Sequence, residues 1–120
     1  MRVFQFMAKS ICVFVLFINS GFAHNSLVAN FPEDGAVLNI GPEELTLRFS
    51  DSTYLETIEI YSEEGVLIDI GFEPSKQASN YFSVPLPELV AGEYQVDWLV
   101  IGDDTHEIKG EFTFIVNYSD

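Results

Sequence analysis

The stretch from Gly92 to Val116, GEYQVDWLVIGDDTHEIKGEFTFIV, decides the fold of this chain. Apolar side chains occupy every second position in much of both arms of the stretch. They are Tyr94, Val96, Trp98 and Val100 in the first arm, and Ile108, Phe112, Phe114 and Val116 in the second. A period of two is typical of a β-strand that turns one face to a core. The stretch therefore predicts two strands joined by a polar connector.

The connector between the arms, Gly102 to His106, carries one of the two histidines of the chain. Asp104 and His106 are two positions apart, so in an extended segment their side chains point to the same side. The two side chains can then converge on one small ligand. On its own, however, such a short motif is more often a solvated turn than a binding site.

The N-terminal segment, residues 1–23, predicts a secretory signal peptide. Two basic residues precede the apolar run Ile11–Ile18, and the small residues Gly21 and Ala23 fit a signal-peptidase site. The run is shorter than the roughly 20 residues that span a bilayer. We therefore expect cleavage after Ala23 and export of one domain, residues 24–120. The alternative is an uncleaved N-terminus that anchors the chain to a membrane.

Cleavage after Ala23 would make His24, the second histidine, the first residue of the processed protein. Its free amine and its Nδ1 atom could then chelate a metal through a six-membered ring. With the imidazole of His106 and the carboxylate of Asp104, these atoms form an N₃O donor set that suits tetragonal Cu(II). Zn²⁺ accepts similar donors in a tetrahedron, but the affinity order of divalent metals favours copper.

Charge and cysteine content exclude several classes of function. Residues 24–120 hold 19 acidic residues and three basic ones, a net charge of −16, which disfavours nucleic acids and anionic membranes as partners. The basic residues are Arg48, Lys76 and Lys109. The single cysteine, Cys12, lies in the predicted signal peptide, so the domain has no disulfide and no thiolate site.

The remaining segments also read as short strands separated by glycine, proline and acidic turn residues. We expect them at 26–31, 36–38, 45–50, around 58–60, at 66–70 and at 81–86. No segment shows a convincing helical period. About seven short strands with regular turns predict an all-β, immunoglobulin-like Greek-key sandwich.

Three stretches of this chain together resemble a known family. Asn30–Ala36, which reads NFPEDGA, and Leu45–Ser50, which reads LTLRFS, are similar to the opening of CopC-type copper-resistance proteins. Gly92–Val116 resembles the G-x-Y-x-V-x-W…D-x-H…G-x-F-x-F-x-V pattern of the same family. The resemblance covers the whole processed chain.

This resemblance implies a periplasmic β-sandwich that acts as a copper carrier or buffer in copper homeostasis or resistance. It implies one Cu(II) ion per chain, held by His24, Asp104 and His106, and no enzymatic activity. The usual partner of the family is a CopD-type inner-membrane copper permease. We expect a monomer without stable membrane association.

The chain also departs from the family pattern. Thr105 replaces the glycine that is usual within D-x-H, and Glu107 replaces the proline that usually follows. Many members carry a methionine-rich Cu(I) site, whereas Met1 and Met7, the only methionines here, lie in the predicted signal peptide. We therefore expect the Cu(II) site alone.

Two other functions remain open from the sequence. One is an oxidative copper enzyme, since an N-terminal histidine with a second histidine resembles a copper brace. A direct carboxylate ligand leaves little open coordination on the metal, and the short chain leaves little surface for a substrate, so both disfavour an enzyme. The other is a metal-free immunoglobulin-like interaction module. Two histidines leave no Ser/His/Asp or Cys/His constellation for hydrolysis.

Overall fold

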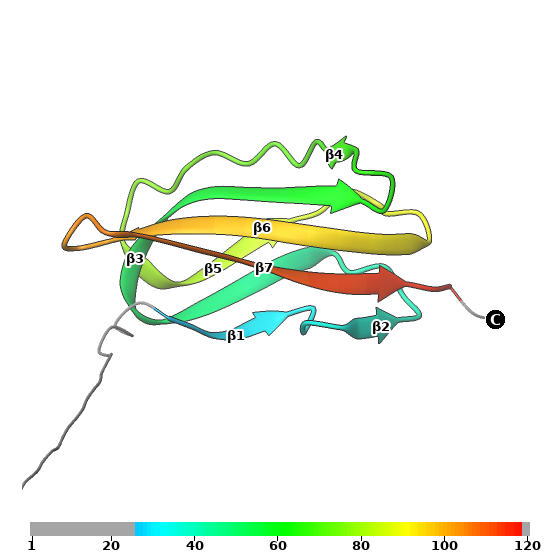
Figure 1. Cartoon of the computed structure of the whole chain (residues 1–120), viewed down its shortest axis with the longest axis horizontal. Helices are drawn as coiled ribbons and strands as arrows, with labels where there is room; N and C mark the ends of the chain where they lie inside the picture. Colours follow the sequence, from blue (N-terminus) through cyan, green and yellow to red (C-terminus); the bar gives the residue numbers. More distant parts are fainter. Residues whose placement is uncertain (1–25, 119–120) are drawn as a thin grey trace, which may run out of the picture.

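The computed structural model describes residues 26–118, so the predicted signal peptide and His24 lie outside the described residues. Within this range the chain forms seven strands and no helix, as predicted for the fold class (Figure 1). The strands are β1 (Leu27–Phe31), β2 (Ala36–Leu38), β3 (Glu44–Ser62), β4 (Leu67–Ile68), β5 (Ser79–Pro85), β6 (Gly92–Gly102) and β7 (Glu107–Val116). The described residues contain no helix that is long and apolar enough to cross a membrane.

Strand β3 joins the two layers of the sandwich. Its first half pairs with β1 on one side and with β5 on the other. Its second half pairs with β6 and β4. Strand β7 continues this layer beyond β6, and β2 closes its edge by parallel pairing with β7. Figure 1 shows β3 curving from one layer into the other.

The continuity of β3 corrects the expectation of separate strands at 45–50 and 58–60. No glycine or proline lies between these segments, so nothing stops the strand. The pairing of β3 with β6 instead shifts register between Leu55 and Thr57. The shift changes the phase of the alternation, so Leu55 and Ile58 both point inward. The strand expected at 66–70 is also shorter, since only β4 is paired there.

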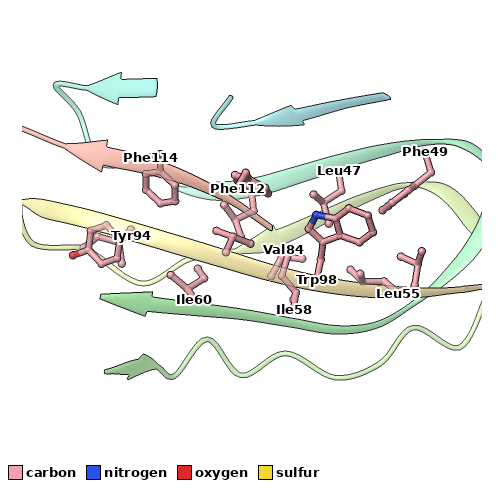
Figure 2. Packing of buried hydrophobic residues seen from close by; sticks show 14 of the residues in the cluster. Leu47, Phe49, Leu55, Ile58, Ile60, Val84, Tyr94, Trp98, Phe112 and Phe114 are labelled. Atoms are coloured by element: carbon pink, nitrogen blue, oxygen red, sulfur yellow. The ribbon is translucent and has the colours of Figure 1, made fainter. Parts of the chain in front are cut away.

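The core lies between the two layers and draws on both arms of the opening stretch. The buried apolar residues are Leu45, Leu47, Phe49, Leu55, Ile58, Ile60, Val84, Leu89, Tyr94, Val96, Trp98, Val100, Phe112, Phe114 and Val116. Figure 2 shows many of these side chains filling the space between the strands. Trp98 packs edge-on against Phe49, with ring centres 5.3 Å apart, and Tyr94 stacks on Phe114 at 5.5 Å.

Gly110 interrupts the apolar alternation of β7 because the Trp98 ring occupies its side-chain space. The two residues are direct partners in the β6–β7 ladder. A Cβ atom on Gly110 would lie 2.5 Å from Cζ2 of Trp98, far inside van der Waals contact. The absence of a side chain at this position lets the ring pack against the backbone of β7.

The β6–β7 hairpin ends in the polar connector, which lies at the same end of the sandwich as the start of β1. Thr53 of β3 pairs with Gly102, and its hydroxyl donates a 2.8 Å hydrogen bond to the Ile101 carbonyl. Three residues earlier on β3, the Ser50 N–H donates to the Ser26 carbonyl at 2.9 Å. Figure 1 shows the connector and the first described residues at one end of the molecule.

Candidate metal site

The connector forms a compact turn that its own backbone holds. The Gly102 N–H donates to the His106 carbonyl at 3.0 Å, and the Thr105 N–H donates to the Gly102 carbonyl at 2.9 Å. These bonds close the hairpin directly beyond the last β6–β7 pair, Ile101 and Glu107. The turn is therefore an ordered platform at the end of two long strands.

Asp104 and His106 meet within this turn, as their spacing predicted. The Asp104 Oδ2 atom lies 2.7 Å from the His106 Nδ1 atom. The other carboxylate oxygen, Oδ1, accepts the His106 backbone N–H at 3.1 Å. One carboxylate thus fixes both the backbone and the ring of the histidine two positions later.

Thr105, between the two, has a left-handed backbone with φ of +66°. Few residues other than glycine adopt this region, because the Cβ atom crowds the backbone by about 1–2 kcal/mol. The Thr105 hydroxyl also donates to the Asp104 carbonyl. The geometry explains why glycine suits the middle of such a D-x-H segment and shows that threonine can occupy the position.

The contact perturbs the protonation of both side chains. The hydrogen bond from the His106 ring lowers the pKa of Asp104, and the same bond raises the pKa of His106. Both side chains are open to solvent, with 55 % of Asp104 and 80 % of His106 exposed. An incoming cation could therefore reach the carboxylate and the imidazole, but it would have to displace the proton that they share.

The described residues contain two of the three predicted metal ligands. Between residues 26 and 118, no three histidine, cysteine, aspartate or glutamate side chains gather in a way that could hold a metal. The structure brings Asp104 and His106 together, while the third predicted ligand, His24, lies outside the described range. The predicted ligand set therefore stays a prediction.

Thr53 is the residue near this turn that the sequence analysis did not single out. It is fully buried, and its hydroxyl donates a hydrogen bond to the carbonyl of Ile101 near the end of β6. The signal that could have found it is its spacing, because Thr53 lies in phase with the buried residues Phe49 and Leu55. The polar residues directly before it hide that alternation.

Fold and turn define a small two-layer β-sandwich with a carboxylate–imidazole pair at one end. The family model of the CopC domain matches residues 27–117. The chain therefore belongs to the CopC family.

Named relatives and solved structures agree with this membership. Copper resistance protein C of Escherichia coli is 30% identical over 110 residues, which cover 81% of this chain and 84% of the relative. Protein YobA of Escherichia coli K12 is 32% identical, with 81% and 82% covered. The crystal structure of CopC from Methylosinus trichosporium OB3b superposes with a TM-score of 0.67 at 26% identity, over 78% of this chain and 94% of that one. PcoC, a methionine-rich copper resistance protein from Escherichia coli, gives 0.60 at 26% identity, over 79% and 100%.

Proposed function

We propose that this protein is a periplasmic copper carrier or buffer that holds one Cu(II) ion. The ligands are the amine and imidazole of His24, the carboxylate of Asp104 and the imidazole of His106. Membership of the CopC family and relatives named for copper resistance support the metal and the role. A CopD-type inner-membrane permease is the proposed recipient or source of the ion.

The observation that carries the proposal is the 2.7 Å separation between Asp104 Oδ2 and His106 Nδ1. Metal–nitrogen and metal–oxygen bonds of about 2.0–2.1 Å that meet at a right angle place their donor atoms about 2.8–3.0 Å apart. Neighbouring ligands of a tetragonal Cu(II) ion have this arrangement. The two donor atoms of the pair thus already lie at the spacing of neighbouring copper ligands, and to bind the ion each group has to turn from its partner toward the metal.

The chain length from Ser26 supports the participation of His24. Ser26 is hydrogen-bonded to Ser50 at the end of the sandwich that carries the connector. An extended chain spans at most about 3.3–3.6 Å per residue, so two residues reach about 7 Å beyond Ser26. Because Ser26 lies at the same end of the molecule as Asp104 and His106, this length brings His24 toward them.

The donor types favour Cu(II) over Cu(I). Three nitrogens and one carboxylate oxygen suit the divalent ion, whereas Cu(I) prefers thiolate and thioether sulfur. Residues 26–118 contain neither cysteine nor methionine. In this respect the chain differs from the methionine-rich relative PcoC. We propose no catalytic step, because four protein donors fill the strong equatorial positions of the ion.

The test is a Cu(II) titration with EPR on protein that begins at His24, beside a form with one additional alanine in front. The authentic form should bind one copper tightly with nitrogen-rich tetragonal parameters. The extended form should bind at least about tenfold more weakly, because its amine is tied up in a peptide bond. Equal binding by the two forms would remove His24 from the site.

A second pair of variants tests the described half of the site. H106A should lose copper affinity. E107A, which replaces the exposed residue next to His106 but none of the proposed ligands, should keep it. Both variants should keep the thermal midpoint of the native protein, because His106 is 80 % exposed. Unchanged copper binding by H106A would contradict the proposal.

A further inference from the structure

An apolar surface lies at the opposite end of the sandwich from the connector. Four exposed large residues form it, and we call them the distal patch: Phe31, Val37, Ile40 and Tyr118. Ile40 and Val37 are the most open of them, with 75% and 64% of their surface exposed. Large apolar residues scattered singly need no explanation, but a contiguous group on a small soluble domain marks an interaction surface.

Two adjoining hollows make the distal patch contiguous. The first, of ≈ 540 Å³, is lined by Phe31, Val37 and Ile40 among others. The second, of ≈ 370 Å³, is lined by Ile40, Leu89 and Tyr118 among others. Ile40 borders both hollows, together with the three residues that follow it, so the hollows adjoin along this segment. Figure 1 places β2 and the segment after it at the end away from the β6–β7 turn.

The backbone beneath the distal patch is fixed. The Tyr118 hydroxyl donates to the Leu89 carbonyl at 2.6 Å, and its ring end covers Gly41, where a Cβ atom would lie 2.5 Å from the hydroxyl oxygen. The Asn117 N–H donates to the Leu38 carbonyl at 2.7 Å. A surface that is already ordered loses little entropy when it is covered, which favours binding.

The charges around the distal patch select its partner. Glu43 borders both hollows, and Glu88 borders the second. None of the three basic residues of the domain lines either hollow, and Arg48 lies over the ring of Tyr81 instead. An acidic rim on a domain of net charge −16 repels a second copy of the chain and an anionic membrane, and attracts basic groups.

The free edge of β2 adds a way to hold an extended segment. Strand β2 is the last strand of its sheet, so its outer edge has no strand partner among the described residues. Extended segments bind such edges through main-chain hydrogen bonds and place alternate side chains in neighbouring pockets.

We propose that the distal patch docks an extended segment of another protein, in which apolar side chains alternate with lysine or arginine. The apolar side chains enter the hollows on either side of Ile40, and the basic ones face Glu43 and Glu88. Because the connector lies at the other end, the partner and the proposed copper site do not compete. This inference stands independently of the copper proposal.

The test is an NMR titration of ¹⁵N-labelled protein that begins at His24 with a capped peptide, Lys-Val-Lys-Ile-Lys-Val-Lys. Amide shifts should concentrate at residues 37–43, 86–91 and 117–118. The V37S/I40S variant should bind at least about tenfold more weakly, since it removes two apolar contacts in the hollows. V66S, which removes a valine that is 58% exposed and lies outside both hollows, should bind as the native protein does.

Two further peptides and two assays can overturn the proposal. Replacing valine and isoleucine of the peptide by serine, or lysine by glutamate, should abolish localised binding, and equal binding by either would overturn the proposal. Concentration-dependent dimers in sedimentation that V37S/I40S removes would assign the patch to a second copy. Cosedimentation with phosphatidylglycerol vesicles that the same variant abolishes would assign it to a membrane. Either outcome overturns the docking of a basic protein segment.

Discussion

The packing of Trp98 over Gly110 leads to a quantitative prediction for the substitution G110A. The new Cβ atom would lie 2.5 Å from Cζ2 and 2.9 Å from Cε2 of Trp98. Carbon atoms pack at about 3.5–4.0 Å, so ring or strand must move by about 1 Å. Trp98 is only 7% exposed and packs against Phe49, which leaves the ring little room. Overpacking of this kind costs about 1–3 kcal/mol.

Urea and thermal unfolding, followed by far-UV circular dichroism, measure this cost, because the signal does not depend on Trp98 and serves every variant. For a domain of this size a loss of 1 kcal/mol lowers the melting temperature by about 4–8 °C, so G110A should melt about 5–20 °C lower. In the W98F background the same substitution should cost at least about 1 kcal/mol less, because the bulk of the indole ring is gone. If G110A unfolds at the same urea concentration as the native protein, the account of this packing is wrong.

The other predictions concern the connector and its support. In the metal-free protein the pKa of His106 should lie above its ordinary 6.5, and D104N should return it towards that value in an NMR titration; an unchanged pKa in D104N would contradict the role of Asp104. The pair attracts only while the carboxylate is charged and the imidazole protonated. Its contribution is therefore lost as pH falls through the lowered pKa of Asp104, below 3.8, and as pH rises through the raised pKa of His106. Copper must displace the His106 proton, so Cu(II) affinity should still be rising with pH above 6.5, and a plateau below that pH would contradict this. T105G should keep copper binding, since glycine accepts the left-handed backbone, whereas T105P should weaken it at least about tenfold because proline fixes φ near −65°; equal titrations would show that the turn geometry is unimportant. T53V should lower the free energy of unfolding by about 1 kcal/mol by removing the hydrogen bond to Ile101, without changing copper affinity, and a loss of copper would show that Thr53 acts on the site.

The sequence predicted the hairpin well because its information is local. Alternation of apolar side chains reports which face of a strand is buried, and Tyr94, Val96 and Phe114 are buried as expected. Gly110 breaks that alternation. Glycine is needed there because the ring of Trp98 occupies the space of a side chain, and this contact depends on the register between β6 and β7.

The path of β3 and the pairing that closes the sheet edge could not be predicted from the sequence. A bend without glycine or proline leaves no composition signal, so β3 was expected as two strands. The parallel pairing of β2 with β7 joins residues almost 80 positions apart, and no local pattern encodes such a choice of partner. The distal patch depends on the same closure, because it combines residues from both ends of the domain.

By itself, the sequence determined the all-β class, the two arms of the hairpin and the nearness of Asp104 to His106, because each depends on neighbours a few residues apart. The left-handed backbone of Thr105, which accompanies the 2.7 Å contact, became visible only in the folded turn. Tertiary structure alone decided that Ser26 and the connector share one end of the sandwich, since that depends on β1 pairing with β3 and β3 pairing with β6. Local periodicity fixes which face of a strand is buried, whereas the choice of pairing partners fixes which distant residues meet.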